Sequence, residues 1–463
     1  MIIKPQLRML DLTMIVIGLV IGMGIFRASP EVAANAQVPW VFFAAWILGA
    51  VISMIGALTF AEIGSRYPAA GGFYKIFSHC YHPAFAFMVN WIIVISNAAS
   101  TAGVAIMGAE YILPMIFPET AGDLQMKLVT ISAVVILYVV NFFGIRTGSR
   151  VLNVLMFVKI GLLLLIISSI FIDLAPPPVN TDVVPGDFVS SAFKVVPHSE
   201  NFIWWKALAL CFIPMFFTYG GYQQTMNFGG DVINPRRTFP RAVFVAMMIV
   251  MGLYLAVNYA YVNSLGFETL KETKTLAADV VGMMFGPTAH KIVSVLMFFS
   301  VMAYVNVSMM SNPRVYFAMA EDKVMPGIFK RVNSKTQVQE FALTLFCIVI
   351  IITLFFATSF IKILEYVMFF DSIGFIAAAA AIFILRKRAK ESGDPEGIFK
   401  MFGYPFLPIL FILAYLTVSV VVLVANPHVA KWGVLLFLSG FPLFYLIRYL
   451  VKATSKEVPE EKL

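Results

Sequence analysis

GLVIGMGIF, residues 18–26, places three glycines at the centre of an apolar run that extends over residues 11–36. A run of this length can cross the hydrocarbon core of a membrane, which takes about 20 residues of α-helix. Glycine lowers the cost of leaving helical geometry, and unwound backbone at membrane depth is tolerated only where it lines a cavity or is buried in protein. The stretch therefore predicts a membrane helix that is interrupted near its middle.

A second interrupted run has the sequence FFTYGGY at residues 216–222, inside the apolar run 203–228. It is the sixth of twelve runs long enough to span a membrane, and GLVIGMGIF lies in the first. The two breaks thus open two successive blocks of five predicted helices. Corresponding breaks in two halves are typical of transporters that bind substrate between inverted repeats. For either cluster alone, close helix packing at small residues is an equal alternative.

The composition supports a membrane protein along the whole chain. Of 463 residues, 60% are hydrophobic and 13% are charged, and the mean hydropathy is +0.88. A soluble domain of this length would lack the polar surface to cover itself. The sequence predicts an all-α polytopic membrane protein with twelve transmembrane helices, at residues 11–36, 40–64, 84–116, 126–143, 149–172, 203–228, 241–263, 288–318, 341–358, 361–385, 404–425 and 431–451.

The distribution of basic residues predicts the orientation. With twelve spans and the N-terminus inside, the inside segments hold 23 of the 33 Lys and Arg residues and the outside segments hold 9. This is the positive-inside pattern, so we expect a multi-pass protein of the cell (inner) membrane with both termini cytoplasmic. The net charge of +8 is then a topology signal and does not indicate nucleic-acid binding.

Other classes of function find little support in the sequence. The three cysteines, Cys80, Cys211 and Cys347, are far apart and have no metal-ligand spacing. We find no Gly-rich phosphate loop, nucleophile motif or repeated filter-like segment, and the hydrophilic stretches are too short for a soluble catalytic domain. An enzyme, receptor or channel is therefore less favoured than a transporter, and no cofactor or metal is expected. The first run is too long for a signal-peptide core and is expected to remain as a membrane helix.

Interrupted helices offer a particular chemistry to a ligand. The N-terminus of a half-helix presents free N–H groups and a positive dipole end to an anionic group, while the carbonyls at an opposed C-terminus can hold a cation. An α-amino acid carries both charges one carbon apart and fits this geometry.

Lys159 is a charge at an unexpected depth. It lies nine residues beyond Arg150, which is about 14 Å into a core of about 30 Å. An ionisable group there is a candidate functional residue, with backbone carbonyls of the first break and the hydroxyls of Ser308 and Ser311 as expected neighbours. It could replace a sodium ion as a fixed cation, carry a proton, or be held by a structural partner.

Asp371 is the second such charge, nine residues from Lys362 in the tenth span. It could face the substrate, carry a proton, or make a structural pair. Asn97 and Asn306 could add polar lining, although an interhelical hydrogen bond is the commoner role for such residues. Phe217, beside the second break, could cover a ligand.

Four segments resemble the amino acid–polyamine–organocation (APC) superfamily: residues 18–26, 61–74, 217–240 and 312–326. Asn234-Pro235 and the sequence LSGFP at 438–442 resemble its L-type amino acid transporter branch. The resemblance implies a LeuT-like 5+5 inverted repeat within one transporter domain over residues 1–463. The first repeat would cover residues 11–172, the second 203–385, and two peripheral helices 404–451.

The resemblance also implies how an amino acid would bind. The carboxylate would meet the N–H groups of Met23 and Gly24, and the amine would meet carbonyls near Val20 and at Phe217. The side chain would point toward the third span, the sixth span beyond Gly220, and the tenth span. Substrate-binding candidates are therefore Val20, Gly22, Met23, Gly24, Phe217, Thr218, Gly220 and Asp371, with Lys159 and Ser308 as coupling candidates.

Two departures bear on the substrate. Met23 stands where the family often has a small residue, and Asp371 stands where it usually has a neutral polar one. We expect sodium-independent amino acid transport, by exchange or proton-linked uptake, because Lys159 matches a lysine that replaces a sodium site in this branch. A carrier of cationic amino acids, polyamines or other amines is the alternative, with Asp371 as counter-charge. Some eukaryotic L-type relatives need a single-span partner subunit. This chain has no evident extracellular cysteine for a covalent partner and is expected to act alone in the lipid membrane.

Overall fold

The computed structural model describes residues 7–22, 24–68, 72–117, 122–172, 202–273, 275–356, 360–394 and 396–456. Within these ranges the chain is helical, and its one β-bridge joins Leu7 to Val232. Met23, a predicted ligand of the substrate carboxylate, lies outside the described residues.

The first half of the chain forms seven α-helices and a 3₁₀ turn: α1 (Met9–Val20), α2 (Gly24–Ala36), α3 (Pro39–Arg66), α4 (Gly72–Cys80), α5 (Pro83–Ile116), α6 (Asp123–Phe142), α7 (Ile145–Ser168) and η1 (Ser169–Phe171). The second half contains α9 (Trp204–Tyr219), η2 (Tyr222–Asn227), α10 (Pro235–Leu265), α11 (Phe267–Glu272), α12 (Leu276–Phe285), α13 (Pro287–Ser311), α14 (Pro313–Glu321), η3 (Gly327–Lys330), α15 (Glu340–Phe356), α16 (Phe360–Ser392), α17 (Phe406–Ala425) and α18 (Pro427–Lys456).

Proline fixes several of these helix starts. Six of the helices, including α3, α5, α10 and α13, have proline as their first residue, where its missing N–H costs nothing because the first N–H groups of a helix have no intrahelical partner. Asn234, before Pro235, adopts the left-handed conformation with φ +51°. Pro313 starts α14 directly after α13, and the two helices together form one candidate span, Pro287–Glu321, at the predicted position 288–318.

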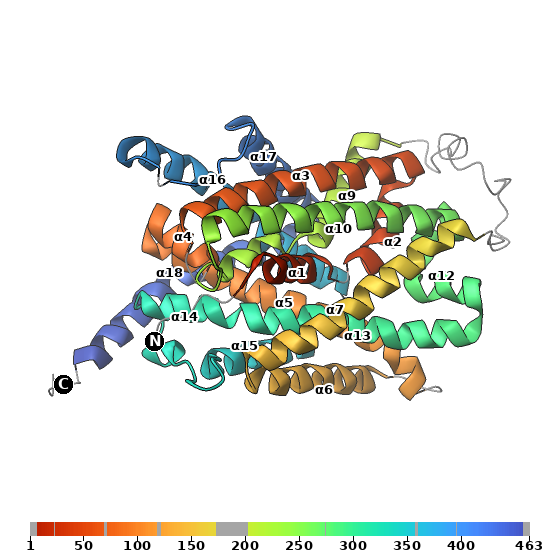
Figure 1. Cartoon of the computed structure of the whole chain (residues 1–463), viewed down its shortest axis with the longest axis horizontal. Helices are drawn as coiled ribbons and strands as arrows, with labels where there is room; N and C mark the ends of the chain where they lie inside the picture. Colours follow the sequence, from red (N-terminus) through yellow and green to blue (C-terminus); the bar gives the residue numbers. More distant parts are fainter. Residues whose placement is uncertain are drawn as a thin grey trace.

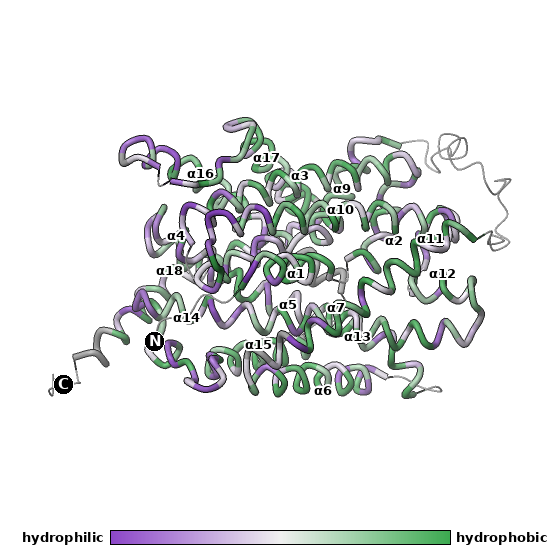
Figure 2. The backbone as a smooth tube through the Cα atoms, viewed as in Figure 1, coloured by the Kyte–Doolittle hydropathy of each residue, from purple (hydrophilic) through white to green (hydrophobic). Residues whose placement is uncertain are grey.

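Nine helices among the described residues are long and apolar enough to cross a membrane, or ten if the bent pair of α1 and α2 forms one span. The polytopic membrane class is thus confirmed, and the count of twelve stays a prediction, with α9 and α15 as shorter helices at two of the predicted positions. In Figure 2 hydrophobic residues follow the long helices, and hydrophilic residues gather toward the ends of the molecule.

Many of the helices pack into two groups. Helix α1 belongs to the first group and also contacts α13 of the second. We call α1, α2, α3, α9 and α10 the bundle, because they pack extensively on one another, and α5, α6, α13 and α15 the scaffold, for the same reason. Figure 1 shows α3 and α10 along one side of the molecule and α6, α13 and α15 along the other. The helices α4 and α14 lie at one end of the molecule, and α12 lies at the other.

Candidate functional site

The first break lies between α1 and α2. Helix α1 ends at Val20, α2 begins at Gly24, and the two axes differ by 41°. The N–H of Gly22 turns back to the Val20 carbonyl at 2.7 Å, so the chain leaves the helix at this point. The interruption predicted from the glycines is confirmed.

The second break, after α9, approaches the first backbone to backbone. Gly221 has φ +108°, a region that side chains other than glycine rarely adopt, and a Cβ there would overlap the carbonyl oxygen of Leu19. On the other side, a Cβ on Gly24 would lie 2.5 Å from the Cα of Thr218. Glycine is required at these two positions because the breaks touch, which also explains why both clusters were visible in the sequence.

Tyr254 joins the two breaks. Its buried hydroxyl, on α10, lies 3.0 Å from the carbonyl oxygen of Val20 and 3.2 Å from that of Thr218. These carbonyls belong to the last turns of α1 and α9, whose final carbonyls lack intrahelical donors. One phenolic proton therefore serves the ends of both half-helices. No sequence pattern marks Tyr254, since a tyrosine in an apolar span is ordinary.

We expect Tyr254→Phe to lower the transport rate constant kcat/KM roughly fivefold to tenfold. The change removes one hydrogen bond of about 1 kcal/mol and leaves two buried carbonyls with one donor fewer. The control is Tyr261→Phe on the same helix, because the Tyr261 hydroxyl is buried without a hydrogen-bond partner in the described structure. Equal effects of the two substitutions on transport in liposomes would contradict the bridging role.

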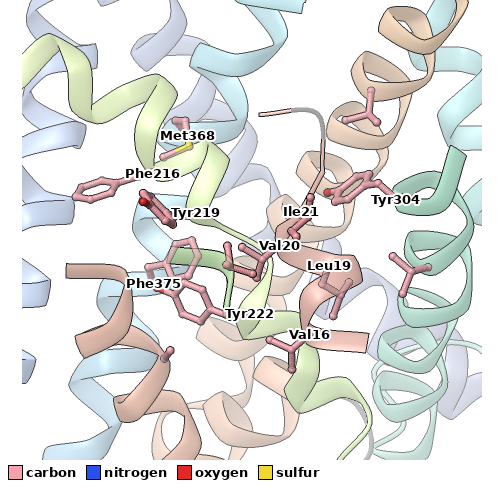
Figure 3. Packing of buried hydrophobic residues seen from close by; sticks show 14 of the residues in the cluster. Val16, Leu19, Val20, Ile21, Phe216, Tyr219, Tyr222, Tyr304, Met368 and Phe375 are labelled. Atoms are coloured by element: carbon pink, nitrogen blue, oxygen red, sulfur yellow. The ribbon is translucent and has the colours of Figure 1, made fainter. Parts of the chain in front are cut away.

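A cavity lies where the two breaks meet. In Figure 3, Tyr219, Tyr222 and Phe375 gather on one side of Val20, and Tyr304 lies on the other. The structure brings together at this cavity all but one of the predicted substrate-binding residues, namely Val20, Gly22, Gly24, Phe217, Thr218, Gly220 and Asp371. Their roles stay predictions.

Among the described residues that line the cavity, Asp371 is the one charged residue. One of its oxygens accepts a hydrogen bond from the Ser96 hydroxyl at 2.9 Å. A second cavity adjoins the first and shares Asp371, Asn97, Gln223, Gln224 and Phe375 with it. Its remaining polar lining is formed by Asn90 and Asn227, so the space beside the breaks is rich in amide groups and holds, among its described lining residues, the carboxyl group of Asp371.

Lys159 is fully buried on α7, and its ammonium donates to the backbone carbonyl of Ile21, directly after α1. The expected contact of Lys159 with a backbone carbonyl of the first break is therefore confirmed. Within the described structure Lys159 makes no hydrogen bond to Ser308 or Ser311. Ser308 instead pairs with Thr101 at 2.7 Å.

Asn97 and Asn306, the two asparagines considered as polar lining, make hydrogen bonds to other helices or their junctions. Asn306 bonds to Asn141 of α6 at 2.7 Å and to the carbonyl of Gly148 of α7 at 2.9 Å. Asn97 donates to Asn312 at 2.7 Å and also lines both cavities. Asn97 therefore has both roles considered for it, an interhelical hydrogen bond and polar lining of the cavities, whereas Asn306 has the hydrogen bonds. Gln224, on η2, is a lining residue that the sequence analysis missed.

A cavity enclosed by two interrupted helices inside a multi-helix membrane chain defines a transporter of small molecules. Comparison with known proteins identifies the family: the model of the amino acid permease family matches residues 7–447, and the chain belongs to this family. It is a multi-pass membrane transporter and not an enzyme. The resemblance to the APC superfamily and its L-type branch is confirmed.

Individual relatives cover almost the whole chain. The chain is 29% identical over 448 residues to the serine/threonine exchanger SteT of Bacillus subtilis (strain 168), covering 96% of this chain and 97% of SteT. It is 25% identical over 458 residues to the large neutral amino acids transporter small subunit 2 of Homo sapiens, covering 96% and 80%. It is also 25% identical over 455 residues to the cystine/glutamate transporter of Homo sapiens, covering 96% and 85%.

Proposed function

We propose that this chain carries amino acids across the cell membrane by sodium-independent alternating access, as an exchanger or by proton-linked uptake. One observation carries the proposal: the backbones of both interrupted helices line one cavity, together with polar side chains of α5, η2, α13 and α16. The relatives' names support amino acids as the substrate class, because these proteins are named as an exchanger or as transporters of amino acids.

The substrate carboxylate is assigned to the start of α2. The first N–H groups of a helix have no intrahelical partner and carry the positive end of the dipole, so an anion is stabilised there. Gly24 begins α2 and lines the cavity, which supports this assignment. The proposed site also includes the N–H of Met23.

The substrate amine is assigned to carbonyls near Val20 and at Phe217. Since the Val20 carbonyl already accepts hydrogen bonds from Gly22 and Tyr254, the amine would meet the neighbouring carbonyls rather than that of Val20. The side chain then extends past Gly220 toward Asn97 and the tenth predicted span. Thr218 and Gly22 complete the wall around the main-chain atoms.

Lys159 supports sodium independence. Its ammonium bonds to the Ile21 carbonyl at the first break, and a fixed cation there leaves no need for a metal ion to balance the carbonyl ends of the half-helices. The coupling role proposed for Ser308 rests on its hydrogen bonds to Thr101 and Asn312, which join α5 to the junction of α13 and α14.

Twelve spans in a 5+5 inverted repeat, with both termini cytoplasmic, is the architecture that we propose. Nine described helices are long enough to span the membrane. Three further spans would be formed by α1 with α2, by α9 with η2, and by α15. The repeats would cover residues 11–172 and 203–385, and the peripheral helices 404–451. We also propose that the chain acts without a partner subunit. The human large neutral amino acids transporter is named a small subunit, whereas the name of the serine/threonine exchanger SteT does not mention a subunit.

A second candidate is a carrier of cationic amino acids, polyamines or other amines. Asp371 favours it, because it places a carboxyl group at the cavity and no lysine or arginine is among the described lining residues. Asp371→Asn keeps the shape and the acceptor for Ser96 but removes the charge. If this candidate is correct, binding of lysine or a polyamine should fall at least about tenfold while neutral amino acids keep their affinity.

A thermal-shift screen of the purified protein against amino acids and polyamines separates the two candidates. A ligand that binds the native state raises apparent stability by mass action, about 2.7 kcal/mol at a hundredfold excess over Kd. Stabilisation by neutral amino acids that persists in Asp371→Asn supports the first candidate. Stabilisation only by amines, lost in Asp371→Asn, supports the second, and no shift with either class contradicts both.

A further inference from the structure

Asp371 places a carboxyl group inside a membrane span, Tyr366–Glu391, and lines both cavities. The residue is partly exposed, and its neighbours Met368 and Phe375, on the same face of α16, line the first cavity with it. Both neighbours are apolar and can be seen near the breaks in Figure 3. The carboxyl group therefore meets the space in which a substrate would bind.

The polar groups around Asp371 do not balance a negative charge. Ser96 of α5 donates its hydroxyl to a carboxylate oxygen at 2.9 Å. Tyr304 of α13 and Tyr415 of α17 interact with the carboxyl group electrostatically, and each offers a phenol rather than a cation. Lys159 lines neither cavity, and its ammonium donates to the Ile21 carbonyl.

The helices that pack on α16 supply no charge to the cavities in the described structure. These helices are α3, α4, α5, α9, α17 and α18. Within the described ranges only α5 and α9 contribute lining residues, all of them uncharged. Glu62 of α3 pairs with Arg66 and with Arg386, which lies several turns along α16 from Asp371. Lys75 of α4 pairs with Asp322 at 2.7 Å.

A neutral substrate changes the surroundings of this carboxyl group. An ionised carboxylate is stable in a cavity while water solvates it, and it is costly once the water is removed without a compensating charge. In the proposed site the amino and carboxylate groups of the substrate are held at the breaks, and its side chain extends toward α16. An uncharged side chain that displaces water beside Asp371 therefore disfavours the ionised form.

Gln224 offers an acceptor that the protonated form can use. Its side-chain oxygen is buried with no hydrogen-bond partner in the described structure, while its amide nitrogen donates to Asn97 at 3.4 Å. Gln224 lines both cavities together with Asp371. A protonated carboxyl group has an O–H to donate, whereas a carboxylate has none. The cavities thus hold an unused acceptor beside a group that becomes a donor when it is protonated.

We propose that Asp371 is the proton site of this transporter and takes up one proton as a neutral amino acid binds. This role deepens the proposed function, for the candidate whose substrate is a neutral amino acid, and rests on it. The proton comes from water on the side to which the cavity is open, and one O–H bond forms at a carboxylate oxygen. The bond breaks again when the cavity opens to the other side and the substrate leaves.

Proton and substrate then strengthen each other's binding, because the coupling between two ligands is reciprocal. Lys159 keeps its charge as the fixed cation at the first break. We expect the affinity for a neutral amino acid to rise as the pH falls, by at most about tenfold per pH unit for one linked proton.

Isothermal titration calorimetry of the purified full chain tests the proposal, with L-serine and L-leucine as the probes. Titrations in phosphate and in Tris at the same near-neutral pH give the number of protons taken up, because the two buffers differ in ionisation enthalpy. For the parent protein we expect roughly 0.3–1 proton per amino acid bound. For Asp371→Asn, which cannot take up the proton, we expect none, and an affinity that no longer changes with pH.

The matched control is Asp123→Asn on α6, which also replaces a carboxylate by an amide. Asp123 is 80% exposed and pairs with Lys127 at 2.7 Å, far from any role in the cavities. We expect this variant to take up as many protons as the parent protein.

Equal proton uptake by the parent protein and Asp371→Asn would overturn the proposal, and so would amino acid binding by the parent protein without proton uptake across the neutral range. If Asp371→Asn fails to fold, judged by size-exclusion chromatography, Asp371→Glu takes its place. It keeps a carboxyl group displaced by one methylene, so its affinity should respond to pH around a different midpoint, and an unchanged midpoint would contradict the role. Absent binding of both probes would instead contradict the proposed function itself.

Discussion

Replacing Lys159 by methionine is expected to reduce amino acid transport by roughly 5- to 150-fold. Methionine keeps the unbranched length and burial of the side chain but removes the donor to the Ile21 carbonyl. A buried acceptor that loses its partner costs about 1–3 kcal/mol, and this acceptor lies at the break that holds the proposed site. Transport by the purified variant in liposomes measures the effect.

The control for Lys159→Met is Lys127→Met on α6. Lys127 pairs with Asp123 at 2.7 Å, and the Asp123 side chain is 80% exposed. A surface pair of this kind contributes little to stability, so transport should stay within about twofold of the parent protein. Normal transport by Lys159→Met would show that the buried ammonium is not needed at the break.

Gly24→Ala is expected to have an effect of comparable size, a loss of transport of at least about tenfold. The substitution keeps the backbone N–H proposed to bind the substrate carboxylate. It adds a methyl group 2.5 Å from the Cα of Thr218, so the two breaks have to separate. Overpacking of this kind costs about 1–3 kcal/mol, and the separation distorts the cavity that both backbones line.

Gly252→Ala on α10 is the matched control for Gly24→Ala. A Cβ at Gly252 meets nothing within 4 Å, and alanine is the better helix former by about 1 kcal/mol. We expect parental transport and equal or higher thermal stability. If Gly24→Ala transported as well as Gly252→Ala, the close contact of the two breaks would have no functional importance.

Much of the fold could be predicted from local sequence alone. Apolar runs of about 20 residues identify membrane helices because the bilayer sets their length, and glycine clusters identified the ends of α1 and α9. The run 288–318 was predicted as one span, and Pro287–Glu321 is one candidate span in the structure, although Pro313 starts a new helix within it. The count of spans depends on α9 and α15, whose apolar stretches are shorter than the bilayer length would suggest.

The site was predictable only in part, because its contacts join residues far apart in the chain. The backbone at the breaks could be identified from glycines, and Lys159 from its depth. Tyr254 is 234 residues from Val20, and no local pattern marks a tyrosine that caps two half-helices. The same holds for Gln224, whose importance comes from its contact with Asn97 at the cavity that both residues line.

Amino acid exchange in liposomes that contain only the purified chain is the decisive measurement of sodium-independent amino acid transport by this protein. The liposomes are loaded with an unlabelled amino acid mixture, and uptake of individual radiolabelled amino acids is followed with choline in place of sodium. We expect uptake of amino acids at the same rate with and without sodium, and slower uptake by Lys159→Met. An absence of uptake for every amino acid, with or without a pH gradient, or uptake that requires sodium, would contradict it.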